Sequence, residues 1–320
     1  MLEIKHMIQS PLNYTGGKFK LLPQILPLFP QKIRTFVDLF CGGCNVGINV
    51  TAEKHIYNDM NLRLIYLLHT LKNLDKSIAF EMIYGIIEKY DLSLVSRHGY
   101  EYYGCESGKG LGAYNKDRFL RLREDFNKLK VDDYYYYVML FVLIVYSFNN
   151  QIRFNSDGKF NLPVGKRDFN ARMSEKLSAF IDVIKTQDSY FKYSDFAKFD
   201  IASLDSDDFV YIDPPYLITC ATYNEQNGWN EGKERQLLSF IDELTDKKIR
   251  CALSNVLQSK GRKNYILLKW LEKNVSRYTV HQLNYSYANS NYHTKDKTNA
   301  AHEVLVTNYV EAEAWNNYGA

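Results

Sequence analysis

Residues 208–216 combine side chains that could do chemistry at the end of a strand. Four mostly β-forming residues, 209–212, lead to Asp213, and two prolines then stop the strand because proline cannot donate to a β-ladder. Tyr216 follows at once and adds an aromatic face. Ligands of open α/β sheets bind just outside the carboxyl ends of the strands, so this stretch is a candidate active site. The alternative is a buried strand that ends in an ordinary Pro-Pro turn.

The amino group of adenine is a chemical target that suits these residues. Its lone pair is delocalised into the ring, which makes N6 a poor nucleophile. If the carboxylate of Asp213 accepts one N6 hydrogen and the carbonyl of Pro214 accepts the other, the lone pair is localised and aimed at an electrophile. Tyr216 would stack on the base, and a base in a duplex would have to be flipped out to reach this pocket. A sulfonium methyl is an electrophile whose positive charge suits the neighbouring acids.

A glycine-rich turn follows the first strand expected in the chain. The apolar strand at 35–40 runs into Gly42, Gly43 and Gly47, and a helix is expected after them, as in nucleotide-binding βα units. The turn is neither a G-x-G-x-x-G fingerprint nor a phosphate-binding P-loop. Asp38 lies within the strand, where it would repel a dinucleotide phosphate and tolerate a cationic ligand better. An NAD enzyme is an alternative for the turn, but it leaves the Asp-Pro-Pro-Tyr stretch unexplained.

Acids also lie at the ends of the next two strands. Residues 55–59 are expected to form a second strand that ends in Asp59, where a carboxylate can hold ribose hydroxyls. Residues 190–196 are expected to form a third strand, with Asp195 near its end. Lys18 lies where a helical pattern begins after a Gly-Gly turn, and the alternative for it is a solvated loop lysine.

Residues 61–148 have a mainly helical pattern. Helices are expected at 61–72, 78–89, 116–129 and 132–148, with a glycine-rich loop at 97–114 that we expect to be mobile. The apolar run at 134–148 is shorter than the roughly 20 residues that a membrane-spanning helix needs. We interpret it as the core helix of an inserted helical subdomain.

Residues 149–167 are expected to form a β-hairpin, with a turn at 156–158 between two short strands. Its polar residues include Asn149, Gln151, Arg153 and Asn155. Asn, Gln and Arg side chains pair bidentately with base edges, and a two-stranded ribbon fits the major groove of DNA. The hairpin is therefore a candidate DNA reader, and a polar surface hairpin is the alternative.

The remaining strands alternate with helices. A helix is expected to follow Ser174, strands are expected at 208–212 and 250–255, and an antiparallel pair is expected at 278–287 and 303–309. This alternation predicts a doubly wound α/β domain.

Length and composition set broad limits. The chain has 320 residues, of which 46% are hydrophobic and 24% are charged, as in soluble globular proteins. The net charge is only +3, so any basic surface must be local. Five cysteines in no paired framework, and an N-terminus unlike a signal peptide, predict a reduced cytoplasmic protein with no membrane segment. Cys41 and Cys44 are interpreted as small loop residues, since zinc would need further ligands.

Five motifs, in this order, resemble those of the Dam-type (D12 class) N6-adenine DNA methyltransferases over nearly the whole chain. They are Tyr14-Thr-Gly-Gly-Lys18, Asp38-Leu-Phe-Cys-Gly-Gly, Tyr57-Asn-Asp59, the hairpin segments Asn149-Asn-Gln-Ile-Arg153-Phe-Asn155 and Phe160-Asn-Leu-Pro163-Val-Gly165, and Asp213-Pro-Pro-Tyr216. The resemblance implies a Rossmann-like, doubly wound, seven-stranded methyltransferase sheet with an inserted, mainly helical DNA-recognition subdomain that carries a β-hairpin. The catalytic domain would comprise residues 1–60 and 171–320, and the recognition subdomain residues 61–170 with the hairpin at 149–167.

The resemblance also implies S-adenosyl-L-methionine as cofactor, with no metal. Cofactor contacts are expected at Tyr14, Lys18, Asp38, Phe40, Gly42, Asp59, Asp195, Phe196 and Asp213. The catalytic pocket is expected to contain Asp213, Pro214, Pro215 and Tyr216, and base reading is expected from Asn149, Gln151, Arg153, Asn155 and Pro163. The implied partners of this monomer or weak dimer are double-stranded DNA and a cognate restriction endonuclease of a type II system that acts on the same site. Two residues depart from the family pattern: Tyr14 stands where a tryptophan is often found, and Gln151 stands where some members that recognise GATC carry an apolar residue.

Other classes of protein remain as alternatives. A metal-dependent DNA endonuclease would use the loose pattern Asp213 … Glu231-Gly-Lys233, which arises often by chance. An RNA adenine methyltransferase would favour Asn in place of Asp213, and a cytosine-C5 enzyme would need a Pro-Cys nucleophile that the sequence lacks. A DNA-binding module without catalysis would require a dead cofactor pocket.

Overall fold

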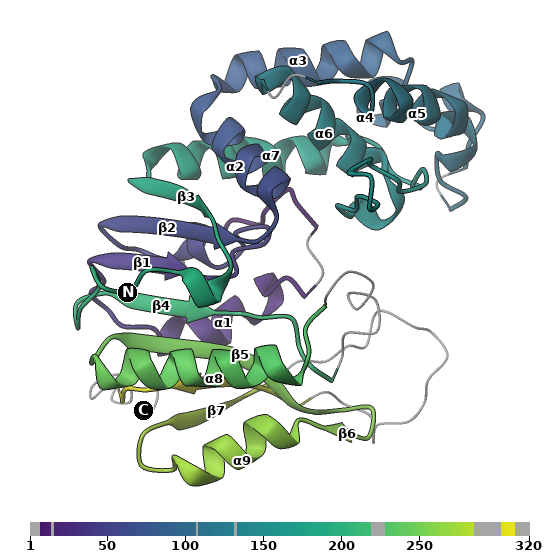
Figure 1. Ribbon diagram of the computed structural model, residues 1–320. Helices are drawn as coiled ribbons and strands as arrows, with labels where there is room; N and C mark the ends of the chain where they lie inside the picture. Colours follow the sequence, from purple (N-terminus) through teal and green to yellow (C-terminus); the bar gives the residue numbers. More distant parts are fainter. Residues whose placement is uncertain are drawn as a thin grey trace, which may run out of the picture. The chain divides into compact units, whose positions relative to one another are not determined.

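The computed structural model describes residues 7–13, 16–106, 108–130, 133–218, 228–284 and 302–310. The chain divides into two compact units (Figure 1). The first, called the helical unit below, comprises Met1–Gly17, Gly42–Asn49 and Asn61–Gln187. The second, called the sheet unit, comprises Lys18–Cys41, Val50–Met60 and Asp188–Ala320. Each unit gathers segments that are distant in the sequence.

A mostly parallel sheet forms the centre of the sheet unit. Its strands within the described residues are β1 (Thr35–Asp38), β2 (Lys54–Asp59), β3 (Ser189–Tyr193), β4 (Phe209–Ile212), β5 (Arg250–Ser259), β6 (Arg262–Lys263), β7 (Thr279–Leu283) and β8 (His302–Thr307). Strands β1 to β5 pair in parallel in the order β3-β2-β1-β4-β5, and β8 runs antiparallel to both β5 and β7. The short β6 pairs with the end of β5. The α/β class, the parallel strands and the antiparallel pair that the sequence predicts are confirmed.

Alternate residues of the central strands form two apolar faces. Val37 and Val210 belong to one buried cluster with Leu237 of helix α8, a helix that the sequence patterns did not single out. On the other face the ring of Phe29 lies 4.7 Å from that of Phe209, centroid to centroid. The helices and 3₁₀ turns of this unit are η1 (Phe19–Leu21), α1 (Leu22–Ile25), η2 (Leu26–Leu28), η6 (Phe196–Lys198), α8 (Glu231–Asp246) and α9 (Tyr265–Lys273).

The helical unit is built around one apolar helix, α6. Its elements are η3 (Gly47–Asn49), α2 (Leu62–Asn73), α3 (Lys76–Lys89), α4 (Val95–His98), η4 (Glu101–Tyr103), α5 (Gly112–Phe126), α6 (Tyr134–Tyr146), η5 (Phe148–Asn150) and α7 (Ala171–Thr186). Every residue of α6 from Tyr137 onward is buried, and α2, α3 and α5 pack against it, so the predicted core helix is confirmed. Across the described part of the chain, none of the helices has the length and apolar character needed to traverse a bilayer.

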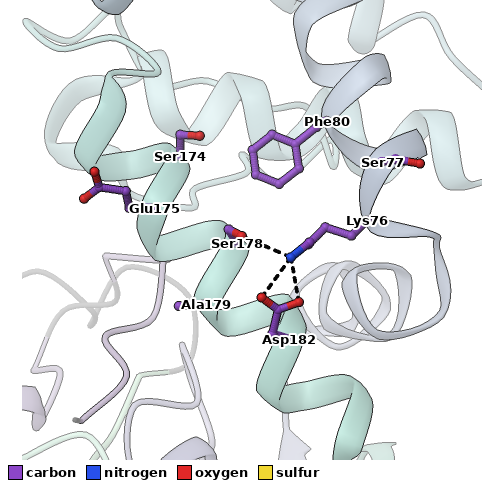
Figure 2. A pocket seen from close by; sticks show the side chains of 8 residues that line it. All are labelled: Lys76, Ser77, Phe80, Ser174, Glu175, Ser178, Ala179 and Asp182. Atoms are coloured by element: carbon purple, nitrogen blue, oxygen red, sulfur yellow. Dashed lines mark hydrogen bonds and ion pairs between the residues drawn. The ribbon is translucent and has the colours of Figure 1, made fainter.

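A shallow hollow lies between α3 and α7 (Figure 2). The ammonium of Lys76 reaches across it to both carboxylate oxygens of Asp182, at 2.7 and 2.8 Å, and to the hydroxyl of Ser178 at 3.3 Å. These bonds join the two helices. The charges of Lys76 and Asp182 are thus already paired with one another.

The prediction of a helix after the glycine-rich turn is wrong. Only the single 3₁₀ turn η3 forms there. Gly42 and Cys44 have left-handed backbones, with φ of 46° and 60°, and these angles prevent a regular helix from starting. The carboxamide of Asn49 instead binds both backbone groups of Ile8, at 2.7 and 2.8 Å.

The segment predicted as a loop at 97–114 contains regular turns. It includes the end of α4, all of η4 and the start of α5. Leu111 is fully buried, and the hydroxyl of Tyr103 accepts a hydrogen bond from the Leu94 amide at 2.8 Å.

A buried carboxylate joins the starting ends of β1 and β4. Asp208 accepts hydrogen bonds from Arg34 Nε and Nη2 at 3.0 and 2.6 Å, and from the backbone amides of Thr35 and Asp205 at 3.0 and 2.9 Å. Burial alone would raise the pKa of Asp208, but these hydrogen bonds outweigh burial and hold its pKa below the ordinary value. The cluster fixes the edge of the sheet opposite the carboxyl ends of these strands.

We predict that Asp208→Ala lowers the free energy of unfolding by about 3 kcal/mol, because it leaves a guanidinium and two amides without their acceptor. Urea denaturation at neutral pH measures the loss. Asp205→Ala is the matched control, since this exposed carboxylate pairs with the same Arg34 at 2.8 Å and should contribute far less. The lowered pKa means that the Asp208 contribution is present at neutral pH and disappears as the pH falls through that pKa. Equal losses for the two variants would contradict the assignment.

Candidate active site

Acids lie at neighbouring positions along one edge of the sheet. Strands β1 to β4 are parallel, so their carboxyl ends share that edge (Figure 1). Asp38 is the last residue of β1 and Asp59 is the last residue of β2. Asp195 follows β3 by two residues, and Asp213 follows β4 directly. Four strand ends therefore bring four carboxylates to the edge where parallel sheets bind ligands.

Asp213 forms a buried ion pair with Lys18. Lys18 Nζ lies 2.9 Å from Asp213 Oδ1, and the lysine side chain is only 4% exposed. The hydroxyl of Tyr216 donates to the same oxygen at 3.2 Å, and Lys18 Nζ also lies 4.8 Å from the centroid of the Tyr216 ring. Both contacts of the carboxylate use Oδ1. Within the described residues, Oδ2 is thus left to accept a hydrogen from a ligand.

Two opposing effects set the charge state of Asp213. Burial is the larger and raises the pKa of Asp213 above its ordinary value, because a carboxylate loses its hydration there. The cation of Lys18 opposes that rise, as does the hydrogen bond from Tyr216. The charge of Glu303, on β8, adds to the increase. The ion pair is therefore what favours the ionised form of this acid.

Three aromatic rings form a cluster beside the strand ends. Phe40 follows β1, Phe196 follows β3, and Trp229 precedes α8. The ring centroids lie 5.5 Å apart for Phe40 and Phe196, 5.7 Å for Phe40 and Trp229, and 5.6 Å for Phe196 and Trp229. We call these residues the aromatic cluster. Phe196 and Trp229 are only 1% and 9% exposed, whereas Phe40 is half-buried. Phe40 is therefore the ring of the cluster with surface left for another flat ring, such as a purine.

Asp195 lies next to the aromatic cluster and has both of its oxygens engaged. Oδ1 accepts from the Ala197 amide at 3.0 Å, and Oδ2 accepts from Lys233 Nζ at 2.7 Å. Burial alone would raise the pKa of Asp195, but the bonds from Lys233 and Ala197 outweigh it, and the pKa lies below its ordinary value. The carboxylate is thus held ionised and in one orientation.

Asn58 joins the ends of two strands from inside the sheet. Its side-chain NH₂ donates to the carbonyl of Leu39 at 2.9 Å and to that of Ser194 at 3.1 Å. The residue is 1% exposed, and its Oδ1 has no hydrogen-bond partner among the described residues. Asn58 therefore links the segment after β1 to the segment after β3, which carries Asp195.

The predicted hairpin is present in the helical unit, but its two strands are reduced to isolated bridges. Phe154 and Phe160 form one antiparallel bridge around the turn. The side chain of Asn155 accepts hydrogen bonds from the amides of Asp157 and Lys159, at 3.1 and 2.9 Å, and thus shapes the turn. Such local side-chain bonds compete with a regular ladder, which explains why the strands are so short.

Side chains of the helices fasten this hairpin. The carboxamide of Asn127 binds both the amide and the carbonyl of Phe160, at 2.8 and 3.0 Å, as a neighbouring strand would. Arg63 donates to the Gly158 carbonyl at 3.0 Å, and its guanidinium carbon lies 4.1 Å from the centroid of the Phe154 ring. The turn is therefore held in place without a sheet.

The chain matches a known protein family over most of its length. Residues 14–300 match the model of the D12 class N6 adenine-specific DNA methyltransferases. The chain belongs to this family. It is 41% identical to the type II methyltransferase M.FokI of Planomicrobium okeanokoites over 94% of this chain and 43% of that protein. It is 40% identical to the modification methylase StsI of Streptococcus sanguinis over 95% of this chain and 43% of that protein.

A shorter relative is matched over most of its own length. The DNA adenine methylase of Salmonella typhi is 27% identical over 81% of this chain and 84% of that protein. The chain spans less than half the length of the two more similar relatives. Family membership thus covers the region that contains the strand-end acids and the hairpin.

The structure places most of the residues predicted for the cofactor and catalytic sites of this D12-class chain in the sheet unit. These are Lys18, Asp38, Phe40, Asp59, Asp195, Phe196, Asp213, Pro214, Pro215 and Tyr216. Tyr14 lies outside the described residues, and Gly42 belongs to the helical unit. The contact of Lys18 with Asp213 and its burial exclude the alternative of a solvated loop lysine.

The predicted base-reading residues of the D12-class chain differ in exposure. Asn149, Arg153 and Pro163 are exposed, whereas Gln151 and Asn155 are half-buried. The guanidinium Nε of Arg153 donates to the side-chain oxygen of Asn161, at 2.9 Å. This bond holds the guanidinium in one orientation on the hairpin.

Sequence patterns missed several residues of this D12-class site. Trp229 belongs to no motif, and Lys233 belongs only to the nuclease pattern. Both reach the site through the position of α8. Asn58 carried a usable signal, since it lies inside the motif Tyr57-Asn-Asp59, but no role was predicted for it. The nuclease pattern does not assemble: Glu231 is exposed and lies 3.4 Å from Arg235, while Lys233 pairs with Asp195.

We predict that Lys18→Met raises the pKa of Asp213 further, because the variant removes the cation that lowers it while burial remains. Carbon-13 NMR titration of protein labelled at aspartate carboxyls measures the pKa, with Asp213→Asn to assign the signal. Lys20→Met is the control. Lys20 is exposed and lies two residues after Lys18, in η1, so this variant should leave the Asp213 titration unchanged. An unchanged Asp213 titration in Lys18→Met would contradict the role of the ion pair.

Proposed function

We propose that this chain transfers a methyl group from S-adenosyl-L-methionine to N6 of adenine in a short double-stranded DNA site. The observation that carries the proposal is the arrangement of Asp213. Its Oδ1 is held by Lys18 and Tyr216, and its Oδ2 has no partner among the described residues and can accept from a ligand amine, in a chain of the D12 class. The names of the similar M.FokI and StsI proteins, a type II methyltransferase and a modification methylase, favour the same activity.

In the proposed mechanism, Asp213 and the Pro214 carbonyl accept the two N6 hydrogens of a flipped adenine. The lone pair of N6 is then localised and points at the methyl group. The positive charge that grows on N6 is stabilised by the nearby carboxylate, which is already oriented before the reaction. Tyr216 and the adjoining Pro215 bound the base, and the cation of Lys18 fixes the tyrosine ring. Flipping is required because N6 is out of reach inside a duplex.

The acids and the aromatic cluster fit the proposed cofactor. S-adenosyl-L-methionine, when bound, supplies an electrophilic methyl group on a positively charged sulfur. Asp38 and Asp213 suit its cationic groups, and Asp59 suits its ribose hydroxyls. Phe40 and Asp195 suit its adenine, through a flat apolar surface and a hydrogen-bond acceptor. Lys18 and Phe196 complete the contacts proposed within the sheet unit, and the contacts of Tyr14 and Gly42 stay predictions from the family resemblance.

The order of the strands supports this location. Starting from β1, the chain adds β2 and β3 on one side and then β4 and β5 on the other. Ligands of doubly wound sheets bind where the order reverses, which here lies between β1 and β4. Asp38 and Asp213 end these two strands. We therefore propose a Rossmann-like methyltransferase sheet whose seven-stranded path is β3-β2-β1-β4-β5-β8-β7, with the short β6 beside it. Residues 1–60 and 171–320 are proposed as the catalytic domain.

The remaining residues, 61–170, are proposed as the DNA-recognition subdomain. Its hairpin at 149–167 presents Arg153, with Asn149, Gln151, Asn155 and Pro163, to the base edges of double-stranded DNA. Asn155 would contribute through its NH₂ group, since its oxygen shapes the turn. A cognate restriction endonuclease with the same recognition site, a cytoplasmic location, and a monomer or weak dimer complete the proposal.

We predict that Asp213→Ala loses at least about a thousandfold in turnover, because both the acceptor for N6 and its negative charge disappear. Transfer of labelled methyl to duplex DNA of mixed sequence measures the activity, with circular dichroism to confirm folding. Asp205→Ala, an exposed acid at the opposite edge of the sheet, is the control. Normal methylation by Asp213→Ala would contradict the mechanism. Methyl transfer to RNA alone by the unaltered chain would instead indicate an RNA adenine methyltransferase.

We predict that Arg153→Ala relaxes sequence choice at one base pair by about 1–3 kcal/mol, the amount that a bidentate contact contributes. Mapping of methylated adenines on plasmid DNA treated with each variant measures the discrimination. Arg172→Ala removes the same charge from an exposed position at the start of α7 and should only weaken binding uniformly. If Arg153→Ala leaves discrimination intact, the hairpin arginine does not read a base.

A further inference from the structure

In the first turn of α8, the consecutive residues Lys233 and Glu234 contact different partners. Lys233 Nζ lies 2.7 Å from Asp195 Oδ2 and 5.3 Å from the centroid of the Phe196 ring. Glu234 is fully buried and accepts a hydrogen bond from the indole nitrogen of Trp229. One helical turn thus contacts an acid at the strand ends and two of the three rings of the aromatic cluster.

The Glu234 carboxylate fixes the start of this helix. Its second oxygen accepts from the side-chain NH₂ groups of Asn264, at 2.8 Å, and Asn255, at 3.3 Å. Asn264 also caps α9 by accepting from the Leu267 amide at 3.1 Å. A buried carboxylate needs such donors, and the positive end of the helix dipole stabilises it further. The first turn of α8 is therefore tied to β5, to α9 and to Trp229.

The ion pair between Lys233 and Asp195 differs from an exposed surface ion pair because α8 is anchored and both side chains are partly buried. The two side chains are 34% and 21% exposed, so water screens their attraction only in part. The Ala197 amide already holds the other oxygen of Asp195. With both oxygens held, the carboxylate is restrained to one orientation. Its remaining lone pairs keep a fixed direction.

We propose that Lys233 is a positioning residue for the purine end of the methyl donor, acting through Asp195. It holds the carboxylate so that this group can accept a hydrogen bond from the exocyclic amine of a purine packed on the aromatic cluster. The inference rests on the proposed function, since it takes the methyl donor as the ligand of this edge. The opposite possibility is that Lys233 competes with the purine for Asp195, and the two ideas predict changes of opposite sign.

The test uses Lys233→Met, which removes the charge and keeps a side chain of similar length. Equilibrium binding is measured by calorimetry, without DNA, for S-adenosylhomocysteine and for 5′-methylthioadenosine, which lacks the amino-acid end. Both are expected to bind about tenfold more weakly, the effect of losing one oriented hydrogen bond to a charged group. The KM for the donor should rise by the same factor, while kcat at saturating donor and the affinity for DNA change less than about twofold.

Two controls separate positioning from a loss of structure or of charge. Arg235→Met, on the same helix with an exposed side chain, should leave the binding of both ligands in place. Lys233→Arg keeps a cation on Asp195 and should recover most of the affinity. In addition, Lys233→Met should cause no further loss in the Asp195→Asn background, because the lysine acts only through that carboxylate.

Each other outcome overturns the inference. Unchanged or tighter binding by Lys233→Met means that the lysine is idle or competes with the ligand. A loss for S-adenosylhomocysteine alone means that it acts at the amino-acid end. If the unaltered chain binds neither ligand and methylates no DNA, the proposed function itself fails. If it binds both and methylates DNA, the results for the variants bear on Lys233 only.

Discussion

The buried ion pair between Lys18 and Asp213 is the interaction on which the candidate active site depends. An acid at the end of a buried strand loses its hydration, and burial raises the pKa of Asp213 for that reason. A neutral carboxyl would be a weaker acceptor for an amine and would not stabilise positive charge on it. Lys18, 2.9 Å away and almost fully buried, opposes this loss of charge. The lysine and Tyr216 share Oδ1, so these contacts leave Oδ2 without a partner among the described residues.

The parallel sheet explains why these groups meet at one edge. The Arg34–Asp208 cluster fixes the starting ends of β1 and β4, and Asn58 links the segments that follow β1 and β3. Between these constraints, Asp38, Asp59, Asp195 and Asp213 end neighbouring strands at the carboxyl edge. The network of buried Glu234 then ties the first turn of α8 to the same edge through Trp229. The site is therefore a product of the strand order, and its side chains are held by elements that are far apart in the sequence.

In the helical unit, the side chains that bind the hairpin backbone are different from the side chains that the hairpin exposes. Arg63 and Asn127 bind its backbone, so the turn needs no continuous ladder. Arg153, by contrast, is exposed and is oriented by hydrogen bonds to the side-chain and backbone oxygens of Asn161. A backbone held in this way can carry different exposed side chains without losing its shape.

By itself, the sequence determined the α/β class, the strands, the apolar core helix and the acids at the strand ends. Strands and buried helices follow from local periodicity and from prolines, which act over a few residues. Only the tertiary structure decided that Lys18 pairs with Asp213, that Trp229 and Lys233 join the site, and that helix side chains hold the hairpin. Local rules also failed after the glycine turn, where left-handed angles at Gly42 and Cys44 and side-chain bonds from Asn49 replaced the expected helix. The reason is general: a contact between distant residues depends on the order of strands in the sheet, which no short stretch of sequence encodes.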